Sequence, residues 1–138
     1  MIKYLLFATI NMNIHAVNSD LVVSLTNLVR GQKSALEKFN AELRLHPLVV
    51  VKCTKNNCPP CKVFAPKFST IAKEFQGKAH FMELEVERFQ ALVAPYKVKR
   101  VPMVLIFSHG KLTHTLFDGK LQNLTSVLTQ LTSPITLK

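Results

Sequence analysis

The 138-residue chain lacks tryptophan altogether and contains only three cysteines and four glycines. Three cysteines are too few for the dense disulfide scaffold that stabilises small secreted domains. No internal repeat or low-complexity tract is present. The hydrophobic fraction is 48% and the charged fraction 19%, a balance typical of folded globular proteins and not of disordered chains. We therefore expect one domain with its own hydrophobic core.

Acidic side chains are also scarce. Eight of them stand against eighteen lysines and arginines, and the formal net charge is +10. Such a charge is compatible with nucleic acid, an anionic membrane surface or acidic partners. The basic residues are scattered, however, and no RNA-binding signature with interleaved aromatics is present. We interpret the charge as a basic, soluble surface, and we expect no nucleic-acid partner.

The first sixteen residues resemble a secretory signal peptide. Lys3 precedes an apolar segment at 4–10, and Ile14-His15-Ala16 stands where a cleavage site would lie. Two asparagines interrupt the pattern, and the segment is too short to span a bilayer. We expect residues 1–16 to be a signal peptide of an exported, periplasmic or secreted protein without stable membrane insertion. The alternative is an N-terminal extension of a cytoplasmic protein.

Hydrophobic periodicity predicts alternating strands and helices. The predicted strands are 21–25, 48–53, 79–86, 104–107 and 112–117, and the predicted helices are 32–45, 62–77, 87–98 and 121–131. Leu36 lies on the apolar stripe of the first helix, and Leu131 faces inward on the last. The β-branched run at 48–53 is typical of a strand buried on both faces. The order β-α-β-α-β-α-β-β-α predicts an α/β fold with one central mixed sheet flanked by helices.

Two cysteines, Cys58 and Cys61, stand three positions apart between the buried strand and the second helix. The N-terminus of a helix stabilises negative charge, so a thiolate at Cys58 is expected to have a lowered pKa. The spacing places the second sulfur one turn away, close enough for a disulfide. Cys58 would then attack a substrate disulfide, and Cys61 would resolve the mixed disulfide.

The dipeptide between the cysteines is Pro59-Pro60. Pro59 suits the first position of a helix, whereas Pro60 disfavours helical angles at the residue before it. Neither residue has an N–H group, so Cys58 can be capped only from Cys61 onward. We expect a stiff, slightly displaced start of the helix.

Two other interpretations of the pair remain open. A zinc site needs four ligands, and only Cys53 and scattered histidines are available to complete one. A structural pair without redox activity is the second alternative. Cys53 itself lies on the buried strand and is expected to act as a small apolar residue.

Taken together, the strand, the CPPC motif, a proline inside the following helix and the hairpin resemble the thioredoxin family from about Leu21 to Leu131. Arg100-Val101-Pro102 resembles the family's cis-proline loop, and Gly119 the glycine after the hairpin. The resemblance implies a thioredoxin-like domain at 21–132, with 133–138 as a C-terminal tail.

This resemblance also implies roles for single residues. Cys58 resembles the family's exposed nucleophile and Cys61 its buried resolving thiol. Val101 and Pro102, together with Pro59 and Pro60, resemble the surface that binds substrate, where an extended segment of the partner pairs with the loop. A β-branched residue such as Val101 before the proline is more similar to the reducing members than to the oxidising or isomerising ones.

The chain departs from the family pattern in three places. Asn57 stands where tryptophan is usual, and Pro59-Pro60 replaces Gly-Pro. Lys52 stands where a buried acid is usual, whereas Glu83 stands where a lysine often lies. We predict that Lys52 and Glu83 form a semi-buried ion pair, with Glu83 as the missing base. The alternative is a solvated Glu83 and a Lys52 that extends outward.

The sequence thus predicts a monomeric thiol–disulfide oxidoreductase that reduces protein disulfides through Cys58 and Cys61. Its expected partners are protein disulfide substrates and an upstream reductase or electron donor. No metal or organic cofactor is expected. The alternatives are a redox-inactive interaction module of the same fold, or an exported oxidant or isomerase.

Overall fold

The computed structural model describes residues 21–29 and 32–134 of the chain. The predicted signal peptide at 1–16 lies outside these residues. Within the described ranges, no helix is both long and apolar enough to cross a bilayer.

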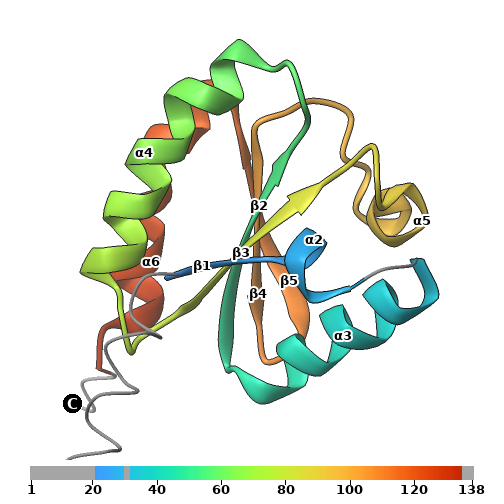
Figure 1. Ribbon diagram of the computed structural model, residues 1–138. Helices are drawn as coiled ribbons and strands as arrows, with labels where there is room; N and C mark the ends of the chain where they lie inside the picture. Colours follow the sequence, from blue (N-terminus) through green and yellow to red (C-terminus); the bar gives the residue numbers. More distant parts are fainter. Residues whose placement is uncertain (1–20, 30–31, 135–138) are drawn as a thin grey trace, which may run out of the picture.

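One five-stranded sheet forms the centre of the molecule, in the order β1-β3-β2-β4-β5 (Figure 1). Strands β1, β3 and β2 run parallel, and β4 is antiparallel to both β2 and β5. The strands are β1 (Val22–Ser24), β2 (Leu48–Thr54), β3 (His80–Glu85), β4 (Met103–Ser108) and β5 (Lys111–Phe117). The mixed sheet confirms the predicted fold class.

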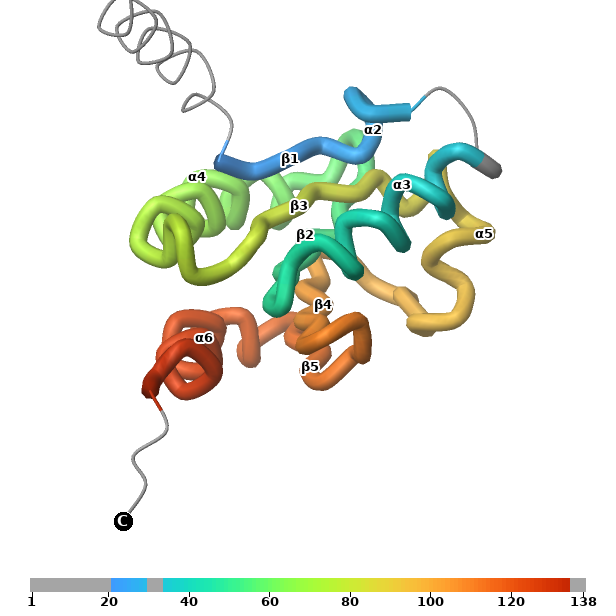
Figure 2. Tube along the Cα trace, turned by 90° about the horizontal axis from the view of Figure 1, so that it is seen from below, coloured from blue at the N-terminus to red at the C-terminus, as the bar shows by residue number. Residues whose placement is uncertain are grey.

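Helices cover both faces of this sheet. Figure 2 shows α4 and α6 on one side and α3 and α5 on the other. The helices are α2 (Leu25–Leu28), α3 (Gln32–Leu45), α4 (Pro59–Glu74), α5 (Gln90–Val93) and α6 (Leu124–Thr132), with 3₁₀ turns at Ala94–Tyr96 and Asp118–Asn123.

Strand β2 divides the core into two clusters because successive side chains point to opposite faces of a sheet. Val49, Val51 and Cys53 join the cluster beneath α3 and α5. Val50 joins the cluster beneath α4 and α6. By the same alternation Lys52 belongs to the α4 face, where it is 4% exposed. The predicted strand with two buried faces is therefore confirmed, with one charged residue in it.

The hairpin between β4 and β5 turns at His109-Gly110, as predicted. Both residues have positive φ, at 50° and 81°, as a two-residue type I′ turn requires. A glycine suits this position because it has no Cβ to clash.

Three details differ from the sequence prediction. Helix α2 was not expected, and the last helix begins at Leu124 because residues 118–123 form a 3₁₀ turn instead. Leu36 and Leu131 were placed inward but are 49% and 38% exposed. Both lie at the edge of their apolar stripe, where periodicity alone cannot separate core from boundary.

Candidate active site

The connection from β2 to α4 positions the cysteine pair. Strand β2 ends at Thr54, and Cys58 is the N-cap of α4 with an extended backbone. Between them Asn57 has a φ of 54°. Asparagine tolerates this left-handed conformation better than most residues with a side chain. Asn57, noted in the sequence only as a departure from the family pattern, thus has a local role in this turn.

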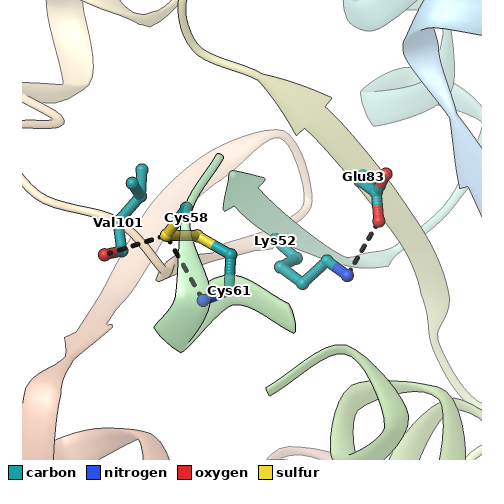
Figure 3. Close-up of a disulfide and its surroundings, with 5 residues drawn as sticks. All are labelled: Lys52, Cys58, Cys61, Glu83 and Val101. Atoms are coloured by element: carbon teal, nitrogen blue, oxygen red, sulfur yellow. Dashed lines mark hydrogen bonds and ion pairs between the residues drawn. A yellow bond between two sulfur atoms is a disulfide. The ribbon is translucent and has the colours of Figure 1, made fainter. Parts of the chain in front are cut away.

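Cys58 and Cys61 form a disulfide, with Cα atoms 5.2 Å apart (Figure 3). The backbone N–H of Cys61 donates a hydrogen bond to Sγ of Cys58, at 3.3 Å. Pro59 and Pro60 occupy the first positions of α4 and carry no N–H. The prediction that Cys58 is capped only from Cys61 onward is therefore confirmed for this turn.

Exposure does not distinguish the two cysteines. Each is only 4% exposed, so the prediction that Cys58 is an exposed nucleophile is wrong for this oxidised form. The reason lies in a distant segment, since the Val101 carbonyl oxygen is 4.0 Å from Sγ of Cys58. The two cysteines differ instead in position, because Cys58 is the N-cap and Cys61 lies within the helix.

The segment Val101-Pro102 lies beside the disulfide. Its peptide bond is cis, as expected for this loop. The segment stands just outside the sheet ladder, because the pairing of β4 with β2 begins at Met103. Val101 is half-buried and Pro102 buried, whereas Pro59 and Pro60 are exposed. The sequence-predicted substrate residues therefore gather around one disulfide.

An open groove of about 650 Å³ extends from this segment between α4 and the 3₁₀ turn. Its lining is mainly apolar, and Lys67 and Asp118 supply opposite charges. Val63 is 66% exposed although it is an aliphatic residue. Pro60, Val101 and Pro102 were predicted for this region; the other lining residues, which sequence reasoning missed, are Val63, Phe64, Lys67, Ile71, Asp118, Gly119, Leu121 and Gln122.

Lys52 and Glu83 form the predicted ion pair. They are register partners on the parallel strands β2 and β3, and Nζ of Lys52 is 2.7 Å from Oε2 of Glu83. The Lys52 side chain is 5% exposed and that of Glu83 33%. Nζ also lies 5.3 Å from the centre of the Phe68 ring, a cation–π contact. In Figure 3 Lys52 lies between the disulfide and Glu83, with its ammonium group on the Glu83 side.

Cys53 is the free cysteine of the described chain and is completely buried. Burial raises its pKa to about 12, because an apolar interior disfavours the thiolate. Cys53 points to the α3 face of β2, away from the face of Lys52. It therefore behaves as the small apolar residue that the sequence predicts.

The model of the thioredoxin family matches residues 31–130. The chain belongs to the thioredoxin family. Among curated members it is 29% identical to thioredoxin H4 of Arabidopsis thaliana over 77 residues, 56% of this chain. It is 33% identical to a Staphylococcus aureus thioredoxin over 54 residues, 39% of this chain. The matched regions span 65% and 52% of the length of these two relatives.

Solved thioredoxin structures agree with the fold. A mutant thioredoxin of Halobacterium salinarum superposes with a TM-score of 0.67 at 21% identity, covering 83% of this chain and 93% of the other. The oxidised thioredoxin of Plasmodium falciparum superposes with a TM-score of 0.66 at 20% identity, covering 81% and 99%. Identities at this level support the fold and leave activity to be argued from the site.

Proposed function

We propose that this thioredoxin-family protein is a thiol–disulfide oxidoreductase that reduces protein disulfides. The observation that carries the proposal is the Cys58–Cys61 disulfide at the N-terminus of α4, beside the Val101 carbonyl. A redox-active pair needs a stabilised thiolate and a second thiol within reach. The N-cap position of Cys58 and the Cys61 N–H support the first requirement, and the position of Cys61 one turn away supports the second.

The reaction follows from thiol–disulfide exchange. The Cys58 thiolate attacks one sulfur of a substrate disulfide, which forms a mixed disulfide and releases one substrate thiolate. The Cys61 thiolate, formed by loss of its proton, then attacks Sγ of Cys58. The second substrate thiolate leaves, and the Cys58–Cys61 disulfide is restored. Two electrons have passed to the substrate, and an upstream reductase or electron donor must return two to regenerate the dithiol.

We infer that the substrate is an extended segment of another protein. Val101-Pro102 lies outside the ladder of β4, where a partner strand can pair with backbone groups. The neighbouring groove offers apolar surface for substrate side chains, including the exposed Val63. This arrangement favours protein disulfides over small-molecule disulfides.

We propose that Glu83 accepts the proton of Cys61 and that Lys52 holds it in place. The ion pair supports this role, because Glu83 is the register partner of Lys52 on the neighbouring strand and its carboxylate pairs with the Lys52 ammonium. Since the Lys52 ammonium lies on the side of Glu83 in Figure 3, the proton would travel indirectly. Glu83→Gln should slow resolution of the mixed disulfide, whereas Glu83→Asp should retain much of it.

Trapping the mixed disulfide tests the function. The Cys61→Ser variant should accumulate mixed disulfides through Cys58, since the resolving thiol is absent. The wild-type protein should reduce insulin in the presence of dithiothreitol. Cys53→Ala is the matched control, because Cys53 is buried on the opposite face of β2, and it should trap nothing and reduce insulin normally. A flat insulin assay with no trapped species would show the fold to be a redox-inactive interaction module.

The direction of the reaction requires its own measurement. Equilibration with glutathione buffers gives the reduction potential of the Cys58–Cys61 pair. A value near that of reducing members supports reduction of substrates. A value of about −120 mV, the potential of a strong oxidant, or of about −180 mV, that of a disulfide isomerase, would instead assign an oxidant or isomerase. We further propose export, on the pattern of residues 1–16, which detection of a shortened mature N-terminus would test.

A further inference from the structure

Three potential metal ligands meet at the end of the sheet opposite the disulfide. Glu42 and His46 lie one turn apart at the C-terminal end of α3, and His80 begins β3. Oε2 of Glu42 is 2.9 Å from Nε2 of His80 and 3.4 Å from Nε2 of His46. Because β2 separates this end from Cys58, the cluster lies about 20 Å from the redox pair at the rise of a strand. Among the described residues, this is the group of histidine, cysteine and acidic side chains with metal-ligand spacing.

The separations of the Glu42 oxygen from the two histidine nitrogens fit a common ion. Ligand atoms at about 2.0–2.1 Å from a tetrahedral zinc ion are about 3.3 Å apart. The two measured separations, 2.9 and 3.4 Å, lie on either side of that value. Two imidazoles and one carboxylate are also a ligand set that zinc accepts.

Nε2 of His80 pairs with the Glu42 carboxylate but makes no well-directed hydrogen bond to a described residue. The atom is buried and makes no hydrogen bond to any described residue, although Oε2 of Glu42 is 2.9 Å away. The carboxylate oxygen therefore lies off the direction that a hydrogen bond requires. Buried polar atoms without a well-directed hydrogen bond are rare, and a bound ion is one explanation for them.

Burial and the neighbouring charges shift the pKa values of two of the three groups. Burial raises the pKa of Glu42, but the Lys38 hydrogen bond and the charges of His80, Lys38 and His46 together bring the pKa below its usual value. Burial, and then the neighbouring His46, lowers the pKa of His80.

An approach from solvent is present. A surface cavity of about 260 Å³ borders the cluster and is lined in part by His46 and His80. The His46 side chain is 38% exposed, so solvent reaches the cluster at this residue. Water from the cavity is available as the fourth ligand of a tetrahedral ion.

We propose that Glu42, His46 and His80 form a binding site for a divalent metal ion of the zinc class. The ion would tie the end of α3 to the start of β3. The two imidazole rings are stacked, with centres 3.8 Å apart and planes 9° from parallel. A metal binds in the plane of an imidazole ring, so the more exposed His46 tilts away from His80 when the ion enters.

Lys38 competes with a metal ion for the negative charge of Glu42. Its Nζ is 3.1 Å from Oε1 of Glu42, the oxygen that does not face the histidines. The Lys38 side chain is 40% exposed, so an incoming ion displaces it into solvent at little loss. Removal of this charge should therefore strengthen metal binding, an effect that a purely structural role of the cluster would not produce.

Calorimetric titration of the oxidised full-length protein with zinc chloride tests the proposal. Oxidation keeps Cys58 and Cys61 in a disulfide, so that their thiolates cannot bind the ion. We expect one Zn²⁺ per chain, with a Kd below about 100 μM. His46→Gln and His80→Gln should each weaken binding at least about tenfold, as expected when a metal ligand is lost. Lys38→Gln should tighten it at least about threefold, since one competing charge is gone.

Controls separate the site from general affinity for zinc. His109→Gln removes an exposed histidine of the β4–β5 turn and should bind like the wild type. At the same zinc concentration, the Tm of the wild type should rise by mass action, and that of His46→Gln should rise less. Because His46 is exposed, its variant retains the fold even if His80→Gln does not.

Two results would overturn the proposal: no saturable binding to the oxidised wild type, or equal affinity in the wild type and His46→Gln. The proposal does not rest on the proposed function, because the site lies at the other end of β2. Insulin reduction by His46→Gln should equal that of the wild type, whatever the outcome of the titration.

Discussion

Replacement of Glu83 by glutamine should destabilise the protein more than replacement of Lys52 by methionine. Glu83→Gln leaves the Lys52 ammonium, 5% exposed, without its carboxylate 2.7 Å away. Lys52→Met removes the buried charge itself and leaves Glu83, one-third exposed, in contact with water. The two partners of one ion pair thus differ in what their loss leaves behind.

The magnitude follows from burial. Removal of one partner of a fully buried pair costs about 3–5 kcal/mol, whereas an exposed pair contributes about 0–1 kcal/mol. Because Glu83 is one-third exposed, we expect Glu83→Gln to lower the free energy of unfolding by about 2 kcal/mol, between those limits. Lys52→Met should change it by less than about 1 kcal/mol, and the double variant should lie close to Lys52→Met.

Equilibrium unfolding of the oxidised proteins in urea measures these values. At this chain length about 2 kcal/mol corresponds to a decrease in Tm of roughly 6–10 °C. The double-mutant cycle isolates the coupling of Lys52 with Glu83. The reasoning is refuted if Glu83→Gln unfolds within about 0.5 kcal/mol of the wild type, the usual range for surface substitutions, or if Lys52→Met is the more destabilised single variant.

Three further measurements address the neighbouring structure. Cys53 has a pKa of about 12. In the native, reduced protein it should therefore resist iodoacetamide at pH 8 while Cys58 is alkylated, and it should react only after unfolding. Labelling of both cysteines together, detected by mass spectrometry, would contradict this. Pro60→Ala restores an N–H near Sγ of Cys58, which should stabilise the thiolate of the dithiol form. The reduction potential should then rise by about 30 mV, the equivalent of one hydrogen bond to a charged group. An unchanged or lower potential in glutathione buffers would show that the missing donor does not set the potential. Phe39 is 1% exposed and packs edge-on against the ring of Phe107, so Phe39→Ala should lower the free energy of unfolding by about 3–5 kcal/mol. Leu36 is 49% exposed, so Leu36→Ala should lower it by less than about 0.5 kcal/mol. Similar losses in both variants would refute the assignment of Phe39 to the core.

Local patterns carried much of the fold. Apolar periodicity located all five strands and the long helices, and the run at Leu48–Cys53 indicated a strand between two cores. These strands and helices were predictable because their apolar patterns depend on residues near one another in sequence. The short helix α2 and the 3₁₀ turn at Asp118–Asn123 were missed, because segments of four to six residues have too little periodicity to be recognised.

Some features of the site were likewise predictable from local sequence and others were not. The N-cap position of Cys58 and the absence of donors at Pro59 and Pro60 follow from spacing and from the chemistry of proline. The predicted exposure of Cys58 was wrong because its sulfur lies beside the carbonyl of Val101, 43 positions later in the chain. Sequence patterns do not report contacts of that range.

The sequence by itself determined the order of elements and the cysteine pair, because each is a property of residue type and local spacing, and the resemblance to the family marked the exchange of acid and base at Lys52 and Glu83. Only the tertiary structure decided whether that pair is formed, since the register of β2 against β3 sets which side chains are neighbours. It alone assembled the groove beside Val101. It also brought His80 to Glu42 and His46, because helix and strand ends that are far apart in sequence meet where the chain packs around a common sheet.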